Sequence, residues 1–133
     1  MAASIPENFQ DLVTSKITFA HLGTVMKNGT PQVTPIWFSF DGKQILLNSA
    51  KGRVKDKNMR ARPHVALSIL DPDNAYRYIQ IIGEITEITE QGGDDHINAL
   101  AKKYLGQDVY PFRQPGEVRV IYKVTPTKVQ TMG

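Results

Sequence analysis

Residues 51–62 read KGRVKDKNMRAR, and the rest of the chain is best interpreted outward from this stretch. Six of its twelve residues are Lys or Arg, against a single Asp. It follows the apolar run ILLNS at 45–49 and stops at Pro63, so it predicts a strand that leads into a short basic helix. Helix starts present free N–H groups and a partial positive charge, and Lys and Arg add charged donors. We therefore expect a phosphate-bearing ligand here; the alternative is a solvated helix face that only aids solubility.

The length and composition of the sequence limit the classes of protein and the kinds of site that it can form. A chain of 133 residues can bury its own core, and we expect residues 1–133 to form a single domain. The net charge of +3 is concentrated in the basic stretch, which favours a local site over nucleic-acid binding. The absence of cysteine excludes disulfides and thiolate metal sites, and His21, His64 and His96 lack metal-ligand spacing, so no metal is expected.

The N-terminal residues MAASIPENFQ show neither a basic n-region nor an apolar h-region, so no signal peptide is expected. No apolar run approaches the length of a membrane span. These features predict a soluble, cytoplasmic protein without a membrane partner.

Hydrophobic alternation and turn signals predict a chain that is mainly β. Asn28-Gly29 predicts a type I′ hairpin turn, and Asp41-Gly42 predicts a second tight turn. Pro126 falls inside the last expected strand, which requires an edge or a bulge. The expected strands span residues 17–27, 31–40, 44–49, 64–70, 76–90 and 117–131, and two further helices span 6–16 and 92–104.

This order of elements predicts a small antiparallel barrel of six or seven strands. The alternating βαβ pattern of parallel sheets is missing. The glycine-rich loops G-x-G-x-x-G and G-x-x-x-x-G-K-[ST] are missing too, so the common nucleotide-binding loops are excluded.

A series of short motifs carries a family resemblance. In chain order they are Leu22-Gly23-Thr24, Asn28-Gly29-x-Pro31, Pro35-Ile36-Trp37-Phe38, Asp41-Gly42, Arg53-Val54-Lys55-Asp56-Lys57-Asn58-Met59-Arg60, Pro63, Tyr78-Ile79-x-Ile81-x-Gly83 and Tyr104-Leu105-Gly106. Their order and spacing resemble the split β-barrel flavin and deazaflavin oxidoreductases related to pyridoxamine 5′-phosphate oxidase. Within that family the pattern is most similar to the probable F420-dependent enzymes. The resemblance covers most of the chain and implies the FMN-binding split-barrel fold.

The resemblance also implies a homodimer with a cofactor in the groove between subunits. By position, Arg53, Lys55 and Asn58 would hold the cofactor phosphate, and Lys57 stands where relatives often have Arg. Arg62 stands where relatives often have Asp, so it adds positive charge near the site. The full set of expected cofactor-binding residues is Gln32, Pro35, Ile36, Trp37, Asn48, Ser49, Lys51, Arg53, Lys55, Lys57 and Asn58.

The function implied is an oxidoreductase that uses reduced coenzyme F420 for hydride transfer to a small organic substrate. The surplus charge of the basic stretch suits the anionic tail of that cofactor. Two alternatives stay open: an FMN-binding oxidoreductase, and a non-catalytic carrier or sensor for a cofactor or haem-like ligand. No nucleophile–base pair or acidic dyad stands out, so no catalytic residue is assigned. Trp37 suits either the cofactor or a dimer contact, and the loop at 110–113 is a candidate cover for the site.

Overall fold

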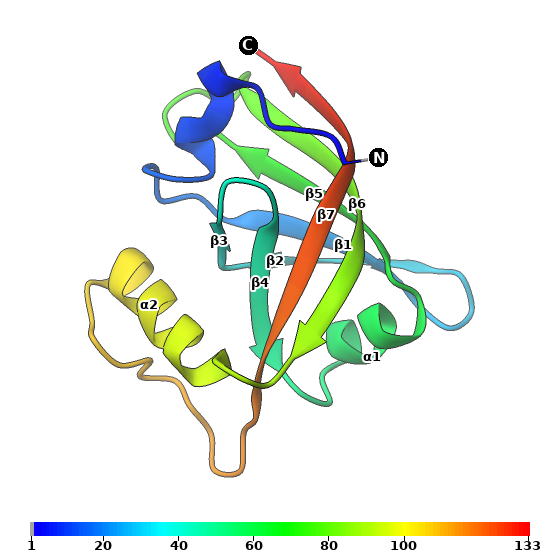
Figure 1. Cartoon of the computed structure of the whole chain (residues 1–133), viewed down its shortest axis with the longest axis vertical. Helices are drawn as coiled ribbons and strands as arrows, with labels where there is room; N and C mark the ends of the chain where they lie inside the picture. Colours follow the sequence, from blue (N-terminus) through cyan, green and yellow to red (C-terminus); the bar gives the residue numbers. More distant parts are fainter. Residues whose placement is uncertain (1) are drawn as a thin grey trace.

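A computed structural model describes residues 2–133 and contains one curled antiparallel sheet of seven strands (Figure 1). The strand order across the sheet is β2-β1-β5-β6-β7-β4-β3. The strands are β1 (Ala20–Val25), β2 (Pro31–Ile36), β3 (Phe38–Phe40), β4 (Ile45–Ala50), β5 (His64–Leu70), β6 (Tyr78–Thr89) and β7 (Arg119–Met132). This sheet confirms the expected mainly β split-barrel fold and the upper estimate of its strand number.

The stretch at 31–40, predicted as one strand, is two strands separated at Trp37. β2 pairs with β1 and β3 pairs with β4, so consecutive strands lie at opposite ends of the strand order. Pro31 and Pro35 lack N–H donors, which suits β2 to a sheet edge. The break places Trp37 where the two ends of the curled sheet approach each other.

The β1–β2 hairpin forms as predicted, but its turn is not of type I′. Gly29 has φ of 89°, whereas no residue other than glycine has positive φ among residues 2–133. The N–H of Gly29 donates to the Met26 carbonyl, and the N–H of Met26 donates to the Thr30 carbonyl. The connection is thus a turn followed by one left-handed glycine, the wider three-residue type of hairpin loop.

The longest strands, β6 and β7, pair along most of their length. Ile79, Ile81 and Ile85 point into the core, and Glu84 and Thr86 point to solvent, as the alternation predicted. The register shifts where Gly83 faces Pro126, so the expected bulge is present at that proline. A Cβ at position 83 would lie 2.6 Å from Val124 Cγ1, which explains the glycine at this crossing.

Three short helices complete the fold: η1 (Glu7–Leu12), α1 (Val54–Ala61) and α2 (Gly93–Leu105). The first is a 3-10 helix, shorter than predicted, and α2 ends at Gly106 with φ of 72°, as its sequence suggested. Helices α1 and α2 lie on opposite sides of one end of the sheet (Figure 1). The core fills the curled sheet, and its largest fully buried side chains include Tyr122, Phe38, Leu12, Leu22 and Met59.

Candidate functional site

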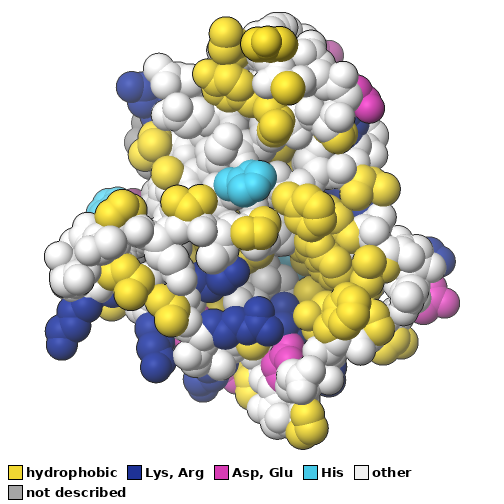
Figure 2. Space-filling model, turned by 180° about the vertical axis from the view of Figure 1, so that it is seen from behind, with side chains coloured by type: hydrophobic (Ala, Val, Ile, Leu, Met, Phe, Trp, Pro, Cys, Tyr) yellow, Lys and Arg dark blue, Asp and Glu magenta, His cyan; other side chains and the backbone are white. Residues whose placement is uncertain are grey.

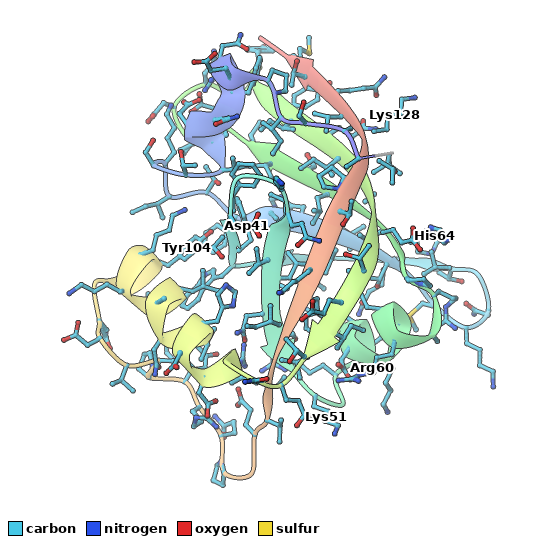
Figure 3. All side chains as sticks on the ribbon, in the orientation of Figure 1. Asp41, Lys51, Arg60, His64, Tyr104 and Lys128 are labelled. Carbon is cyan, nitrogen blue, oxygen red and sulfur yellow. The ribbon has the colours of Figure 1, made fainter. Side chains whose placement is uncertain are left out.

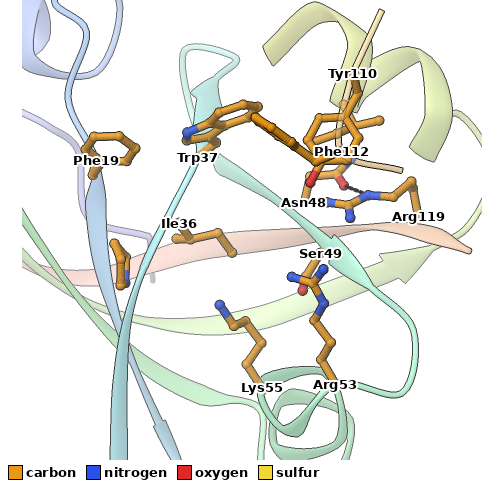
Figure 4. Close-up of a pocket in the computed structure, with 12 residues that line it drawn as sticks. Phe19, Ile36, Trp37, Asn48, Ser49, Arg53, Lys55, Tyr110, Phe112 and Arg119 are labelled. Carbon is orange, nitrogen blue, oxygen red and sulfur yellow. Dashed lines mark hydrogen bonds between the residues drawn. The ribbon is translucent and has the colours of Figure 1, made fainter. Parts of the chain in front are cut away.

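A pocket of about 200 Å³ opens at the end of the sheet that carries α1 and α2 (Figure 4). It lies between the β2–β3 break, the end of β4, the start of α1 and the loop between α2 and β7. Its lining residues are Phe19, Pro35, Ile36, Trp37, Asn48, Ser49, Arg53, Lys55, Ile97, Tyr110, Phe112 and Arg119.

The pocket brings together most of the residues expected to bind a cofactor. Those present in its lining are Pro35, Ile36, Trp37, Asn48, Ser49, Arg53 and Lys55. Strand β4 supplies two of them, the end of β2 with Trp37 in the break after it supplies three, and the start of α1 with its N-cap supplies two. Segments that the sequence could connect only by resemblance therefore meet around one space.

The other four expected residues lie outside the lining. Lys51 pairs with Glu90 through its Nζ at 2.9 Å from Oε2, and Lys57 is exposed on α1. Gln32 accepts a hydrogen bond from a buried threonine of β1. Asn58 is buried, and its Nδ2 donates to that same residue, Thr24, at 3.0 Å. Asn58 thus joins α1 to β1 in this structure.

Two side chains give the pocket a positive wall: Arg53 and Lys55. Neither forms an ion pair with any residue in the range 2–133. Burial lowers the pKa of the Lys55 ammonium, and the nearby Arg53 and Arg119 lower it further. An ammonium whose charged form is destabilised by burial and by other cations gains from an anion placed beside it. This wall is suited to an anion.

Ser49 supplies an independent sign of a ligand. The residue is only 2% exposed, and its Oγ has no hydrogen-bond partner among residues 2–133. Burying a hydroxyl without a partner is unfavourable, so such atoms usually mark a missing partner. Because Ser49 lines the pocket beside Arg53 (Figure 4), a ligand oxygen there would satisfy it.

The turn that presents Arg53 is held from below by a buried carboxylate. Arg53 occupies the N-cap of α1, yet its side chain makes no capping hydrogen bond. Asp56 in the first turn of α1 instead holds the preceding turn, because its Oδ2 accepts from the Gly52 N–H at 2.9 Å. Its Oδ1 accepts from Tyr122 Oη at 2.5 Å and from Arg60 Nε at 2.9 Å. The guanidinium of Arg53 is therefore left available to the pocket.

Asn48 lines the pocket, but its amide is engaged within the protein. Its Nδ2 donates to the Gly93 carbonyl at 3.0 Å and lies 3.1 Å from His96 Nδ1. Its Oδ1 accepts from Arg119 Nε at 2.9 Å. Burial, with a contribution from Arg119, lowers the pKa of His96 to about 4, so this imidazole is neutral near pH 7. Asn48 and His96 thus serve chiefly to orient Arg119.

Arg119 is the functional candidate that sequence reasoning missed. It is 4% exposed at the start of β7, and it lines the pocket. The available signal was an arginine placed directly before the apolar run VIY of the last strand. Phe19 and Ile97 were missed too, since nothing in their local sequence separates them from core residues.

Aromatic rings form the wall opposite the cations. Trp37 and Tyr104 are stacked with centroids 5.0 Å apart and planes 1° apart. Tyr110 meets the Trp37 ring edge-on at 5.9 Å, and Phe112 meets Tyr110 at 5.8 Å. Tyr104 Oη donates to the Thr18 carbonyl at 2.5 Å, and burial raises the pKa of this phenol to about 12. A flat conjugated ring would find matching surfaces here.

The loop between α2 and β7 closes this side of the pocket. Residues 110–113, the candidate cover for the site, lie in this loop. Tyr110 and Phe112 lie in the lining, and the N–H of Tyr110 donates to Asn98 Oδ1 at 2.9 Å. Arg113 turns away and pairs with Asp94 on α2. Both contacts fix the loop against α2, so the aromatic wall is held in place.

The surplus positive charge of the basic stretch is mostly engaged elsewhere. Besides Lys51, Arg60 pairs with Asp56, and Arg62 Nε donates to the Val25 carbonyl at 2.6 Å. Arg62 therefore fastens the end of α1 to β1 instead of facing the pocket. Lys57 is the member of this surplus that is exposed and forms no ion pair within residues 2–133. This distribution weakens the electrostatic argument for a long anionic tail.

The surface of the molecule carries apolar as well as basic regions. Figure 2 shows hydrophobic side chains gathered on one face beside a group of Lys and Arg side chains. Exposed apolar residues of the described chain include Ile17, Phe19, Val33, Leu70, Tyr76, Ile82, Phe112 and Met132. None of the helices in residues 2–133 has the length and apolar character that crossing a membrane requires.

Chemically, the pocket combines donors for an oxyanion with surfaces for a planar ring. No nucleophile–base pair lies in its lining, since its titratable members are Arg53, Lys55, Tyr110 and Arg119. Such a site binds and orients a group that brings its own reactivity.

Comparisons with known proteins agree with this architecture. The family described as Pyridoxamine 5′-phosphate oxidase matches residues 5–133. A solved structure named F420 Reductase is 34% identical, with 95% of this chain and 98% of that chain covered and a TM-score of 0.83. A conserved hypothetical protein from Mycobacterium tuberculosis (21% identity, 98% and 86% covered, TM-score 0.74) shares the fold. So does General Stress Protein 26 from Bacillus anthracis (16% identity, 90% and 88% covered, TM-score 0.65). The chain belongs to the pyridoxamine 5′-phosphate oxidase family, an oxidoreductase-type family of flavin- and deazaflavin-binding split barrels.

Proposed function

We propose that this protein is an oxidoreductase that binds reduced coenzyme F420 and uses it for hydride transfer to a small organic substrate. One pocket brings together the aromatic wall, the cations Arg53 and Lys55 and the Ser49 hydroxyl, and none of these three polar groups has a partner within residues 2–133. This observation carries the proposal. The similarity to a protein named F420 Reductase supports the choice of cofactor.

The residues present suit a phosphorylated ring cofactor. Arg53, Lys55 and Ser49 would hold the phosphate, because together they offer two cations and a hydroxyl that lack partners within residues 2–133. Pro35, Ile36 and the aromatic wall would contact the ring. Once bound, the cofactor supplies the hydride chemistry, while the protein's residues bind it, orient it and limit the access of water.

Titration with both candidate cofactors tests this proposal. Trp37 is the only tryptophan and lies in the pocket lining, so its fluorescence should be quenched as a cofactor binds. We expect saturable quenching with F420 and weaker quenching with FMN, followed by oxidation of reduced F420 when an electron acceptor is added. The absence of quenching by either compound would refute the cofactor site.

The FMN-dependent oxidoreductase is retained as a second candidate because of one observation. Lys51, Arg60 and Arg62 are engaged within the chain, so little free charge is left for the anionic tail that distinguishes F420 from FMN. Tight binding of FMN with none of F420 would favour this candidate. If either cofactor binds but its reduced form is not oxidised by any added electron acceptor, the protein would instead be a carrier or sensor.

The proposal includes a homodimer that shares the site. Val33, Gly23, Ala66 and Ile82 are register neighbours and form an apolar row across the outer face of β2, β1, β5 and β6. Val33 is 64% exposed, which is unusual for an apolar strand residue unless a partner covers it. The pocket of about 200 Å³ is also small for a cofactor site, since ligand pockets typically span roughly 300–1,000 Å³.

Light scattering tests the dimer directly. We expect twice the chain mass at micromolar concentration, and Val33→Arg should shift the protein to monomer and weaken cofactor binding together. A wild-type monomer that binds cofactor with full affinity would contradict the shared site.

The cytoplasmic location stays a prediction, which cell fractionation would test.

A further inference from the structure

Arg119 is held more firmly than any other charged side chain that lines the pocket. Its Nε donates to Asn48 Oδ1 at 2.9 Å, and its Nη1 donates to Glu117 Oε1. The Tyr110 ring covers the guanidinium, with its centroid 5.0 Å from Cζ. With only 4% of the residue exposed, the guanidinium is fixed in one orientation.

Part of this guanidinium has no hydrogen-bond partner among the described residues. Arginine carries five N–H donors, and the bonds to Asn48 and Glu117 use the Nε–H and one N–H of Nη1. Nη2 donates to no acceptor among the residues described, 2–133, yet Arg119 lines the pocket. Nη2 is not among the buried atoms that lack a hydrogen-bond partner in residues 2–133, so it is open to the pocket, where it can donate to an acceptor on a ligand.

The partners of Arg119 define what that acceptor is. Glu117 neutralises its charge from a side chain that is 5% exposed, whereas Arg53 and Lys55 have no such counter-ion in the described part of the chain. Figure 4 shows Arg119 beside Asn48 and Tyr110, while Lys55 and Arg53 rise from the other side of the pocket. A neutralised guanidinium among aromatic rings suits a carbonyl oxygen on a flat conjugated ring better than a second full anion.

We propose that Arg119 is a ring-binding residue that donates hydrogen bonds to the carbonyl edge of the cofactor's ring system. The cofactor is then held at two separate ends, the phosphate by Arg53 and Lys55 and the ring edge by Arg119. This inference rests on the proposed cofactor site and adds a residue that neither the sequence motifs nor the resemblance singles out. The polar edge of the ring is thereby directed towards β7.

Matched ligands with and without phosphate separate the two ends. The probes are FMN and riboflavin, and F420 and its phosphate-free deazariboflavin, each titrated by Trp37 fluorescence. Arg119→Lys keeps a charge beside Glu117 but removes the planar fork. We expect Arg119→Lys to weaken the binding of FMN and the binding of riboflavin by the same factor, about tenfold or more. Lys55→Ala should weaken the binding of FMN and leave the binding of riboflavin unchanged.

Two further variants serve as controls for the effect of Arg119→Lys. The double variant Arg119→Met, Glu117→Gln removes both charges without leaving a buried carboxylate unpaired, and should weaken both members of each ligand pair. Lys123→Gln removes a cation of the same strand, β7, that pairs with Glu87 and does not line the pocket, and should change the binding of neither member. Melting curves confirm that each variant is folded.

The outcomes are distinct. Weakening of FMN but not riboflavin by Arg119→Lys would place Arg119 at the phosphate and overturn the ring-edge assignment, while the cofactor site stands. Unchanged binding of all ligands by both Arg119 variants would overturn it equally. If wild type binds none of the four ligands, the proposed function fails, and this inference fails with it.

Discussion

Two groups of basic side chains in this molecule are treated in opposite ways. At the η1 end of the sheet, Arg77 donates to Asp11 and Asp71, and Lys16 also reaches Asp71, at distances of 2.7–2.9 Å. At the other end, Arg53 and Lys55 approach a pocket without an acidic partner in residues 2–133. Charges that support a fold are paired within the chain, and charges kept for a ligand are left unpaired. The following predictions test that distinction.

The largest effect on stability is expected at the paired end. Arg77→Ala should lower the melting temperature markedly, because it leaves Lys16 as the one cationic partner of Asp71 within residues 2–133 and removes the ion pair between Arg77 and Asp11 of η1. Cofactor binding measured below the melting temperature should be unchanged. Hydrogen bonds from Lys16, the Asp73 backbone and Arg77 lower the pKa of Asp71.

The sign of the pH effect follows from that lowered pKa. The carboxylate stabilises the fold above the unfolded-state pKa of about 3.9 and loses this contribution as pH falls towards the folded-state pKa. The gap in melting temperature between wild type and Arg77→Ala should therefore narrow below about pH 4. A gap that stays constant down to acidic pH would contradict the role given to Asp71.

The largest effect on binding is expected at the unpaired end. Lys55→Ala should weaken cofactor binding by roughly 1.5–3 kcal/mol, the range of a charge-assisted hydrogen bond. The melting temperature of this variant without ligand should stay the same or rise, because the substitution removes a half-buried cation that has no counter-ion within residues 2–133. Isothermal titration and thermal melts measure the two quantities. Full affinity in Lys55→Ala would remove this residue from the phosphate site.

A smaller effect is the pH dependence of binding. Burial, Arg53 and Arg119 lower the pKa of Lys55 in the free protein, and a bound phosphate would raise it again. Affinity should therefore fall as pH rises through the lowered pKa, before the ordinary lysine range is reached. Titrations with FMN above about pH 7.5, where its phosphate monoester is already a dianion, isolate this effect. Lys55→Arg should abolish it, since Arg stays charged.

The smallest effect concerns the choice between cofactors. Lys57 is exposed and without an ion pair in the described chain, so Lys57→Ala should weaken F420 slightly more than FMN, by ~0–1 kcal/mol. The difference should shrink as ionic strength rises, because salt screens exposed charges. Equal losses for both cofactors would show that α1 does not contact the anionic tail.

The sequence predicted those parts of the fold that depend on local pattern. The strand–basic helix junction, the bulge at Pro126 and the end of α2 at Gly106 all follow from residue chemistry at one point in the chain. The prediction of a single strand at 31–40 was wrong at Trp37. The hydrophobic alternation continues across the break, and only the closure of the sheet separates β2 from β3. The type I′ turn failed because Asn28-Gly29 also suits a wider loop, in which only the glycine takes positive φ.

The site was predictable where a motif lies within one segment. Arg53 and Lys55 lie within the basic stretch, and Ser49, expected from the family resemblance, lies just before it. Asn58 sits in the same stretch, but one turn of helix directs it towards β1. Arg119 could not be assigned, since its meaning depends on the pairing of β4 with β7 and on Asn48 across that pair.

That pairing has a consequence for how the molecule folds and unfolds. Ser49 lies opposite Val120 in the β4–β7 ladder, so the two sides of the pocket meet only after contacts between distant segments have formed. Such non-local contacts tend to form late in folding, because closing a long loop is entropically costly. A ligand that needs both sides would then stabilise the native state but not the folding transition state. It should slow unfolding in proportion to its affinity and leave the refolding rate unchanged, so that bound ligand prolongs the lifetime of the folded chain.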